Sequence, residues 1–190
     1  MNKFLLILSL TIISFSACYS QKQAQKLDWK EFVSDEGKFK ATFPDVPKRF
    51  VEELDKQDGK FQSYRFEIEL PRKWFAVSYY DTENSVTLNE DQLNARYDYL
   101  RDETLKLPKY KYELMSERKI SVNGKLGRET IFKVNNSTIL TTRMYRVGNR
   151  FFQVSTTIHS LTADEAAKND ANRFLDSFQL IEDGSKNNGS

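Results

Sequence analysis

Side chains that enzymes use for nucleophilic or metal chemistry are scarce in this sequence. His159 is the only histidine and Cys18 the only cysteine among 190 residues. A Ser-His-Asp site would need an Asp and a Ser brought to His159 by the fold, and one His with one Cys supplies too few ligands for a typical zinc site. Neither a phosphate-binding glycine motif nor EF-hand spacing occurs. The sequence therefore predicts no catalytic residue, no metal site and no cofactor.

Paired carboxylates are the remaining candidates for acid–base chemistry, and they occur at 52–53, 67–69 and 164–165. The first two carboxylates are adjacent on an expected strand and point to opposite faces. The second pair shares a face that the hydropathy pattern places in solvent. The third pair falls in the first turn of an expected helix, where negative charge suits the helix dipole. Each pair thus has a structural explanation, and an extracytoplasmic enzyme that uses carboxylates or tyrosines of an unrecognised motif is the alternative hypothesis.

Aromatic side chains are the first candidates for binding, because the chain holds 14 Phe, 9 Tyr and 2 Trp. Trp74, Tyr79 and Tyr80 fall on one expected strand over residues 73–81. Side chains alternate between the two faces of a strand, so at least one of the three points away from whichever face is buried. An exposed aromatic cluster would bind a partner or a ligand, whereas helices on both faces would cover all three.

Arg128 and Arg143 are the second candidates for binding, on neighbouring strands of an expected hairpin over residues 125–147. If the hairpin pairs the strands closely, Arg143 meets Glu129 across them, and such a contact contributes roughly 0.2 to 1 kcal/mol. That role is structural. A ligand site would also require these side chains to line a concave pocket.

The first 17 residues have the three parts of a secretory signal: a basic start, the apolar run of residues 4–13 and small residues before Cys18. Residues 15–18 (FSAC) resemble a lipobox, with Phe15 where Leu is usual, which implies acylation of Cys18 and a bacterial lipoprotein. The alternatives are cleavage by ordinary signal peptidase after Ser16 or after Ser20. Cleavage after Ser20 would remove the cysteine. Only polar sequence follows, so the lipid is expected to be the only membrane contact.

The charge of the chain is nearly balanced. Removal of residues 1–17 takes away one lysine and no acidic residue, which leaves 28 basic and 27 acidic side chains. Nucleic-acid-binding proteins normally show a clear basic excess. The short basic clusters over residues 106–111 and 143–150 are interrupted by other residue types, and we interpret them as solvated strand and loop faces. No nucleic-acid partner is expected.

The elements that position these residues form one α+β domain at about residues 27–181, after a polar tether at 18–26 and before a disordered tail at 182–190. Period-two alternation at residues 64–70 and at 39–43 predicts strands. Turn residues at 58–59, 123–124, 135–136 and 148–149 predict hairpins that join runs at about 49–56, 61–70, 110–122, 125–134, 138–147 and 150–158. We expect a mainly antiparallel sheet of about seven to nine strands.

Two helices are expected to cover this sheet. The first spans about residues 89–107, with Leu93, Tyr97, Leu100 and Leu107 on its buried face, and Pro108 ends it. The second begins at Thr162, which forms a capping box with Glu165. Its apolar stripe consists of Ala167, Ala171, Phe174, Leu175 and Phe178.

Four segments resemble the landmarks of an uncharacterised family of exported bacterial domains: residues 29–47, 120–129, 143–154 and 173–180. They supply, in order, an aromatic strand with a Phe-Pro-x-x-Pro edge, a Gly-Arg-Glu strand, an Arg-x-Tyr strand and a closing Phe-Leu-x-Ser-Phe. The layout also resembles, more remotely, the PsbP-like α/β/α sandwich of the extrinsic photosystem II protein and a nuclear-import factor that binds the GTPase Ran. The resemblance implies a binding or assembly protein and transfers no binding residues.

The sequence therefore predicts a non-enzymatic exported lipoprotein domain that binds, or helps to assemble, another protein of the cell envelope. A small-molecule-binding module with a cavity between sheet and helix is a further alternative. The candidate residues are Cys18 for lipid attachment and Trp74, Tyr79, Tyr80, Arg128 and Arg143 for binding.

Overall fold

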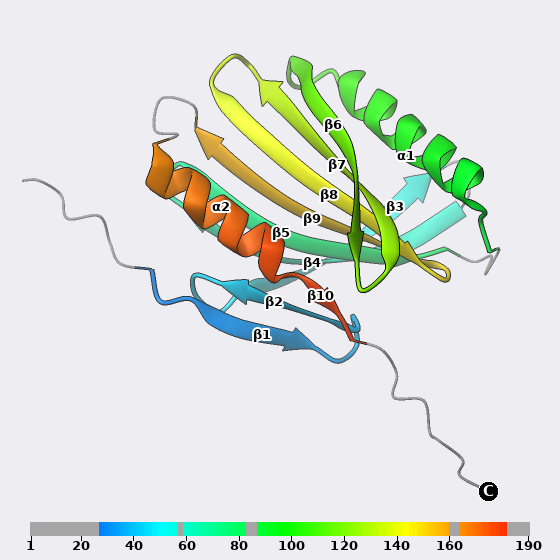
Figure 1. Cartoon of the computed structure of the whole chain (residues 1–190), viewed down its shortest axis with the longest axis horizontal. Coiled ribbons are helices and arrows are strands. Elements are labelled where there is room, and N and C mark those ends of the chain that lie inside the picture. Colours follow the sequence, from blue (N-terminus) through cyan, green and yellow to red (C-terminus); the bar gives the residue numbers. More distant parts are fainter. Residues whose placement is uncertain (1–26, 57–58, 83–86, 160–163, 182–190) are drawn as a thin grey trace, which may run out of the picture.

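A computed structural model of the chain describes residues 27–56, 59–82, 87–159 and 164–181 (Figure 1). Cys18, the predicted signal at 1–17, the tether and the tail at 182–190 lie outside these residues and stay predictions. The described elements, in chain order, are β1 (Lys30–Ser34), β2 (Phe39–Phe43), β3 (Lys48–Lys56), β4 (Gly59–Leu70), β5 (Lys73–Asp81), α1 (Glu90–Leu105), β6 (Tyr112–Val122), β7 (Lys125–Val134), β8 (Thr138–Val147), β9 (Arg150–His159), α2 (Glu165–Ser177) and β10 (Gln179–Leu180).

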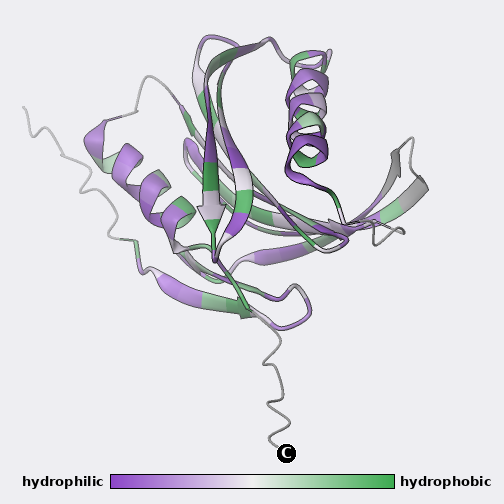
Figure 2. Cartoon of the chain, turned by 45° about the vertical axis from the view of Figure 1, so that its right-hand side comes forward, coloured by the Kyte–Doolittle hydropathy of each residue, from purple (hydrophilic) through white to green (hydrophobic). Residues whose placement is uncertain are grey.

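The strands form two antiparallel sheets. The larger has seven strands in the order β3-β4-β5-β9-β8-β7-β6, and the smaller has three in the order β1-β2-β10. Helix α1 covers part of one face of the large sheet, while α2 and the small sheet cover the other (Figures 1 and 2). The predicted α+β fold, a mainly antiparallel sheet covered by two helices, is confirmed.

The predicted hairpins of the second half are confirmed, and their turns have the expected backbone. Asn123 and Gly124 between β6 and β7 have φ of 46° and 70°. Asn135 and Asn136 between β7 and β8 have φ of 49° and 59°, and Gly148 between β8 and β9 has 60°. Asn and Gly adopt this left-handed region at low cost, so local chemistry fixes the turns and hence the order of the strands.

The main core lies between the large sheet and the layer made of α2 and the small sheet. On β4, Phe66 and Ile68 are buried in this core, whereas Arg65 and Glu67 point to the face of α1, as the alternation predicts. Phe39, on β2, is fully buried and packs against the ring of Phe66 at 5.6 Å between centroids. The small sheet thus packs its aromatic side chains against one half of the large sheet.

Helix α1 begins at Asn89, which accepts a hydrogen bond from the backbone N–H of Gln92, while the Gln92 side chain accepts one from that of Asn89. Tyr97 is the buried centre of its inner face. The helix ends at Leu105, ahead of Pro108. The expectation that Leu107 belongs to the buried face is wrong: Leu107 follows the helix and is 50% exposed. The helix ends two residues before Leu107, so Leu107 does not continue the buried face.

Helix α2 begins later than the sequence predicts. Its N-cap is Asp164, which accepts a hydrogen bond from the backbone N–H of Ala167 at 2.8 Å. Glu165 is the first helical residue, so the expected capping box with Thr162, which lies outside the described residues, is wrong. The predicted stripe is confirmed, because Ala167, Ala171, Phe174, Leu175 and Phe178 are all buried. The opposite side of α2 is hydrophilic (Figure 2).

None of the helices among the described residues is long and apolar enough to span a bilayer.

Candidate functional site

The three candidate aromatics of β5 do not form one cluster. Tyr79 points into the main core and is 1% exposed. Tyr80 lies on the opposite face, where its ring stacks on Phe151 at 5.5 Å. Trp74 shares that face and donates a hydrogen bond from Nε1 to Glu67 at 3.0 Å, but six residues separate it from Tyr80, roughly 20 Å along a strand. The predicted aromatic binding cluster is therefore not assembled by these residues.

The cross-strand pair of Glu129 and Arg143 forms as the hairpin predicts. The two residues are register partners, and Arg143 Nε lies 2.7 Å from Glu129 Oε2. Glu129 is 5% exposed and also pairs with Arg118, while Arg143 pairs with Asp176 of α2 at 2.8 Å. Burial raises the pKa of Glu129, but hydrogen bonds from Arg118 and Arg143 outweigh burial and hold that pKa below its ordinary value. This network joins α2 to the sheet.

Arg128 points to the other face of β7 and holds α1. It is 7% exposed, and its guanidinium lies 3.1 Å from Asp98 and 2.8 Å from Glu117. A further hydrogen bond runs from Nη2 to Asn94 at 3.0 Å. Neither Arg128 nor Arg143 lines the cavities between the sheets, beneath α1 or beside the β7–β8 turn. Both arginines thus form ion pairs within the domain, and neither contributes to the lining of these three cavities.

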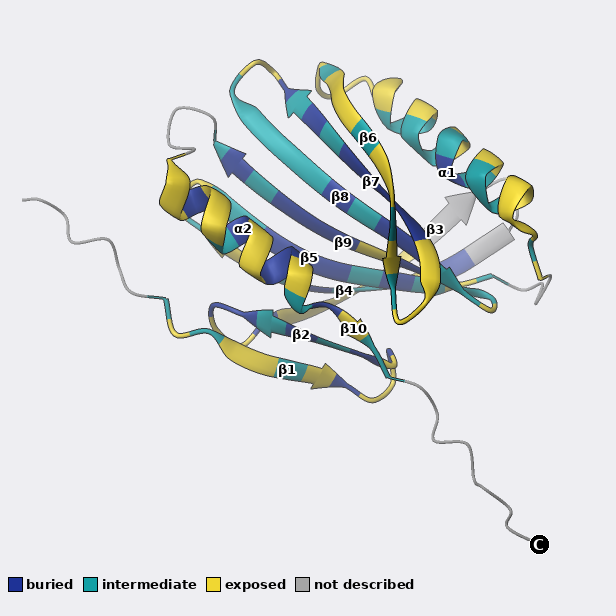
Figure 3. Cartoon of the chain, viewed as in Figure 1, coloured by how far each residue is buried: buried dark blue, intermediate teal, exposed yellow. Residues whose placement is uncertain are grey.

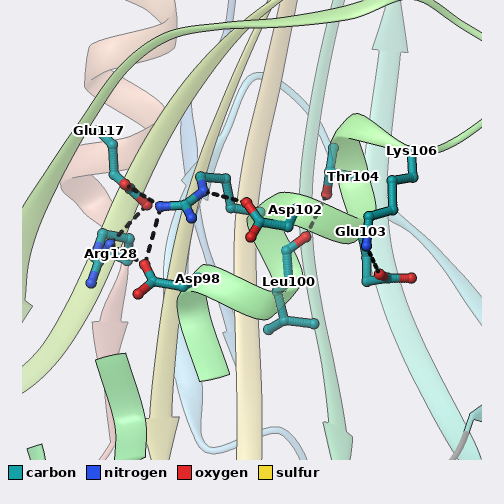
Figure 4. A network of polar contacts seen from close by, with 9 residues as sticks. Asp98, Leu100, Asp102, Glu103, Thr104, Lys106, Glu117 and Arg128 are labelled. Carbon is teal, nitrogen blue, oxygen red and sulfur yellow. Dashed lines mark hydrogen bonds and ion pairs between the residues drawn. The ribbon is translucent and has the colours of Figure 1, made fainter. Parts of the chain in front are cut away.

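A second arginine completes the network on the α1 side (Figure 4). Arg101 pairs with Glu117 at 2.8 Å, with Asp98 at 3.1 Å and with Asp102 at 2.8 Å. Hydrogen bonds to Asp102 and Glu117 raise the pKa of Arg101, so its charge is fixed. Two arginines and two carboxylates shared between α1, β6 and β7 therefore hold the C-terminal half of α1 against the edge of the sheet.

These ion pairs determine which parts of α1 and β6 lie side by side. Glu90, at the start of the helix, pairs with Lys119 at 3.0 Å, and Arg101 pairs with Glu117. The helix and the strand consequently run past each other so that residues after Arg101 lie beside residues before Glu117. The end of α1, the connection and the start of β6 accordingly lie close together at one end of the domain (Figure 1).

This end of the domain carries a cluster of exposed apolar side chains, which we call the β6 apolar patch: Leu105 (36% exposed), Leu107 (50%), Tyr110 (41%), Leu114 (38%) and Met115 (55%). It holds five of the eleven large apolar side chains that are exposed among the described residues. Single exposed apolar residues are ordinary, but several that gather at one end of a domain are typical of an interaction site. The exposed character of β6 and of the end of α1 is visible in Figure 3.

A cavity of about 300 Å³ adjoins this patch. Tyr110 forms one of its walls, and Tyr112, Val134 and Leu140 supply its other apolar lining. Two hydrogen bonds hold the connection in place, from the backbone N–H of Lys111 to Asn135 Oδ1 at 2.8 Å and from the backbone N–H of Asn135 to the carbonyl of Lys111 at 2.9 Å. A pocket of this size accommodates one large apolar side chain of a partner.

Lysines surround the patch. Lys106 pairs with Glu103 at 2.9 Å, Lys109 lies over the ring of Tyr110 at 5.1 Å, and Lys111 is exposed. The sequence pattern predicts a solvated loop face for these lysines and a core position for Leu107. The helix ends at Leu105 and not at Leu107 as predicted, and this difference of two residues makes Leu107 an exposed neighbour of the lysines.

The outer edge of β6 determines which kind of contact a partner can make with this surface. β6 is an edge strand of the large sheet, and its register with β7 shifts between Leu114 and Ser116. Such a bulge interrupts the row of free backbone groups that would template an added strand. Contact with a partner at this point is therefore expected through side chains.

Within residues 27–56, 59–82, 87–159 and 164–181, no three His, Cys, Asp or Glu side chains gather closely enough to hold a metal ion. His159 ends β9, and its backbone N–H donates to the carbonyl of Arg72 at 3.1 Å.

Comparison with known proteins finds similarity in structure. No family model and no curated protein sequence matches the chain. The solution structure of cyanobacterial PsbP (CyanoP) from Synechocystis sp. PCC 6803 is similar over 83% of this chain and 95% of that one, at 10% identity and a TM-score of 0.51. A crystal structure from Bacteroides thetaiotaomicron matches 82% of this chain and 49% of its own length at 16% identity and a TM-score of 0.40. The yeast Ran-binding protein Mog1p matches at 13% identity over 82% of this chain and 97% of its own, with a TM-score of 0.41. The chain thus has an α+β fold similar to that of cyanobacterial PsbP, as the sequence resemblance implies.

Proposed function

We propose that this protein is exported, held at a membrane through acylated Cys18, and acts without catalysis by binding another protein of the cell envelope through the β6 apolar patch. The single observation that carries the binding role is that patch: five exposed apolar side chains beside a cavity, on a surface held by buried ion pairs. The secretory layout of residues 1–17 supports export.

The chemistry of the patch specifies the partner. Its centre favours an apolar anchor such as Leu or Phe, inserted beside Tyr110. Lys109 and Lys111 at its margin favour acidic residues next to that anchor. The partner is therefore a protein segment in which a large apolar side chain is flanked by Asp or Glu.

Leu107→Asp should reduce capture of the partner at least tenfold. The substitution places a carboxylate in the apolar centre and removes the contact of the Leu107 side chain with the partner, which contributes roughly 1 to 2 kcal/mol to the binding free energy. The measurement is quantitative recovery of partners from cross-linked cells that express tagged full-length protein. Val46→Asp is the matched control, since Val46 is 74% exposed and lies outside the patch.

Equal recovery with the Leu107 and Val46 variants would show that the patch is not the docking surface. Turnover of a substrate by the purified protein in a broad hydrolase screen would overturn the non-enzymatic role and favour the alternative of an unrecognised carboxylate or tyrosine site.

The lipid anchor has a separate test. The intact mass of the mature protein should correspond to a chain that begins at an acylated Cys18, and Cys18→Ala should release the protein from membranes. A mature chain that begins at Gln21 would refute the anchor and leave the binding role untouched.

A further inference from the structure

A second cavity lies between the two sheets, at the far end of β6 from the β6 apolar patch. Its volume is about 640 Å³, and it opens to solvent. The lining comes from the β1–β2 turn, from the chain after β6, from the end of β8 and the start of β9, and from the end of β10. Because β6 separates this cavity from Leu114 by roughly 25 Å, the cavity is independent of the proposed protein-binding surface.

The floor of the cavity is apolar and preformed. Val147, Phe152, Leu180 and Ile181 supply it, and Phe152 is also part of the main core. The backbone N–H of Ile181 donates to the carbonyl of Lys38 at 2.9 Å, which closes the wall between β10 and the β1–β2 turn. A volume of several hundred cubic ångströms with apolar walls and few polar groups is typical of small-molecule sites.

The rim of the cavity is cationic. Lys38, Lys125 and Arg150 face one carboxylate, Glu36, among the lining residues. Arg150 donates from Nε and Nη2 to the two carboxylate oxygens of Asp81, each at 2.7 Å. It also donates from Nη1 to the backbone carbonyl of Glu36 at 2.8 Å. Lys125, the first residue of β7, adds an exposed ammonium group. Three cations, Lys38, Lys125 and Arg150, thus meet two carboxylates, Glu36 and Asp81, which leaves one excess positive charge at the margin. The lining therefore favours an anion at its margin and an apolar body at its floor.

Behind the lining, the buried ring of Tyr79 contacts two of the lining residues. Tyr79 packs beneath Arg150, whose guanidinium carbon lies 4.6 Å from the ring centroid, and its ring lies 6.1 Å from that of Phe152. Its hydroxyl has no hydrogen-bond partner within the described residues, and burial raises the pKa of Tyr79 to about 12. The hydroxyl thus stays protonated, and a buried donor of this kind is costly unless something accepts from it.

We propose that this cavity binds a single-chain amphiphile with one anionic head group, either a carboxylate or a phosphate monoester. The chain lies against Val147, Phe152 and Leu180, and the head group lies at the margin near Lys125. The proposal does not depend on the protein partner, and the Leu107→Asp variant should bind the amphiphile as the wild type does.

The test is titration of the ¹⁵N-labelled mature chain, followed by amide chemical shifts, with four probes below their micelle concentrations: dodecanoate, dodecyl phosphate, dodecyl maltoside and inorganic phosphate. Dodecanoate, dodecyl phosphate or both should shift the amides of Val147, Phe152 and Leu180 to saturation. Lys125→Glu should weaken that binding about tenfold, whereas Lys48→Glu, an exposed charge reversal outside the cavity, should change it less than twofold.

Three results would overturn the proposal. Saturation by neither anionic amphiphile would remove the ligand class. Equal affinity for dodecyl maltoside, unaffected by Lys125→Glu, would reduce the cavity to a general apolar site. Saturation of the same amides by inorganic phosphate at equal affinity would leave an anion site with no role for the apolar floor.

Discussion

Glu129→Gln should lower the free energy of unfolding by about 3 kcal/mol at neutral pH, the larger part of it through Arg143. The substitution keeps the size of the side chain and removes its charge. Arg143 is left 13% exposed with Asp176 as its partner, and Asp176 is itself 67% exposed and solvated. Urea unfolding of the mature protein, followed by circular dichroism, measures the loss. Glu31→Gln, which breaks an exposed pair with Lys40, is the control and should cost less than about 0.5 kcal/mol.

The effect of Glu129→Gln should depend on pH in a defined direction. The folded-state pKa of Glu129 is lowered, so the ionised carboxylate stabilises the fold above the unfolded-state pKa, about 4.3 for glutamate. That contribution is lost as pH falls through the lowered pKa. The difference between wild type and variant should therefore be full at pH 6 to 7 and shrink below about pH 4. A difference that stays constant over this range would show that the charge of Glu129 does not stabilise the fold.

Arg128→Met should destabilise the protein by about 2 to 3 kcal/mol and should weaken partner binding even though Arg128 is buried. Methionine fills most of the space and leaves Glu117, which is 19% exposed, with Arg101 as its remaining cation. The C-terminal half of α1 then loses its attachment to β7. Hydrogen exchange should accelerate in α1 more than in α2. Capture of the partner should fall several-fold, because only the pair of Arg101 with Glu117 then holds the end of α1, and with it Leu105, beside β6.

Lys119→Gln is the control for Arg128→Met, since it breaks the exposed pair with Glu90, in which both side chains are more than half exposed. It should change stability by less than about 0.5 kcal/mol and leave partner capture intact. Uniform acceleration of exchange in both helices, with full capture by Arg128→Met, would show that the network stabilises the fold without positioning the patch.

The hairpins and their registers could be predicted from the sequence because their information is local. Asn123-Gly124 and Asn135-Asn136 fix tight turns, and once the second turn is in place Arg143 must meet Glu129. The division of the strands into two sheets was not predictable in the same way. Gln179 pairs with Lys40, and nothing in either segment alone indicates the other.

The candidate site shows the same limit. The helical spacing of the apolar residues correctly predicts that Leu93, Tyr97 and Leu100 lie on the inner side of α1. It places Leu107 there as well, because the hydropathy pattern continues past the residue at which the helix ends. Whether Leu107 is a core residue or part of a docking surface depends on whether the helix continues to it, and the helix ends at Leu105, two residues before Leu107. Trp74, Tyr79 and Tyr80 illustrate the converse, since strand alternation alone separates them.

Site-specific photo-crosslinking in living cells tests the docking surface most directly. A photoreactive amino acid is placed at Leu107, at Met115 and, as a matched exposed position, at Val46 of the full-length protein. We expect one protein adduct of the same mass from positions 107 and 115 and none from position 46. Adducts from position 46 with none from 107 and 115, or no adduct from any of the three, would contradict a partner docked on the β6 apolar patch.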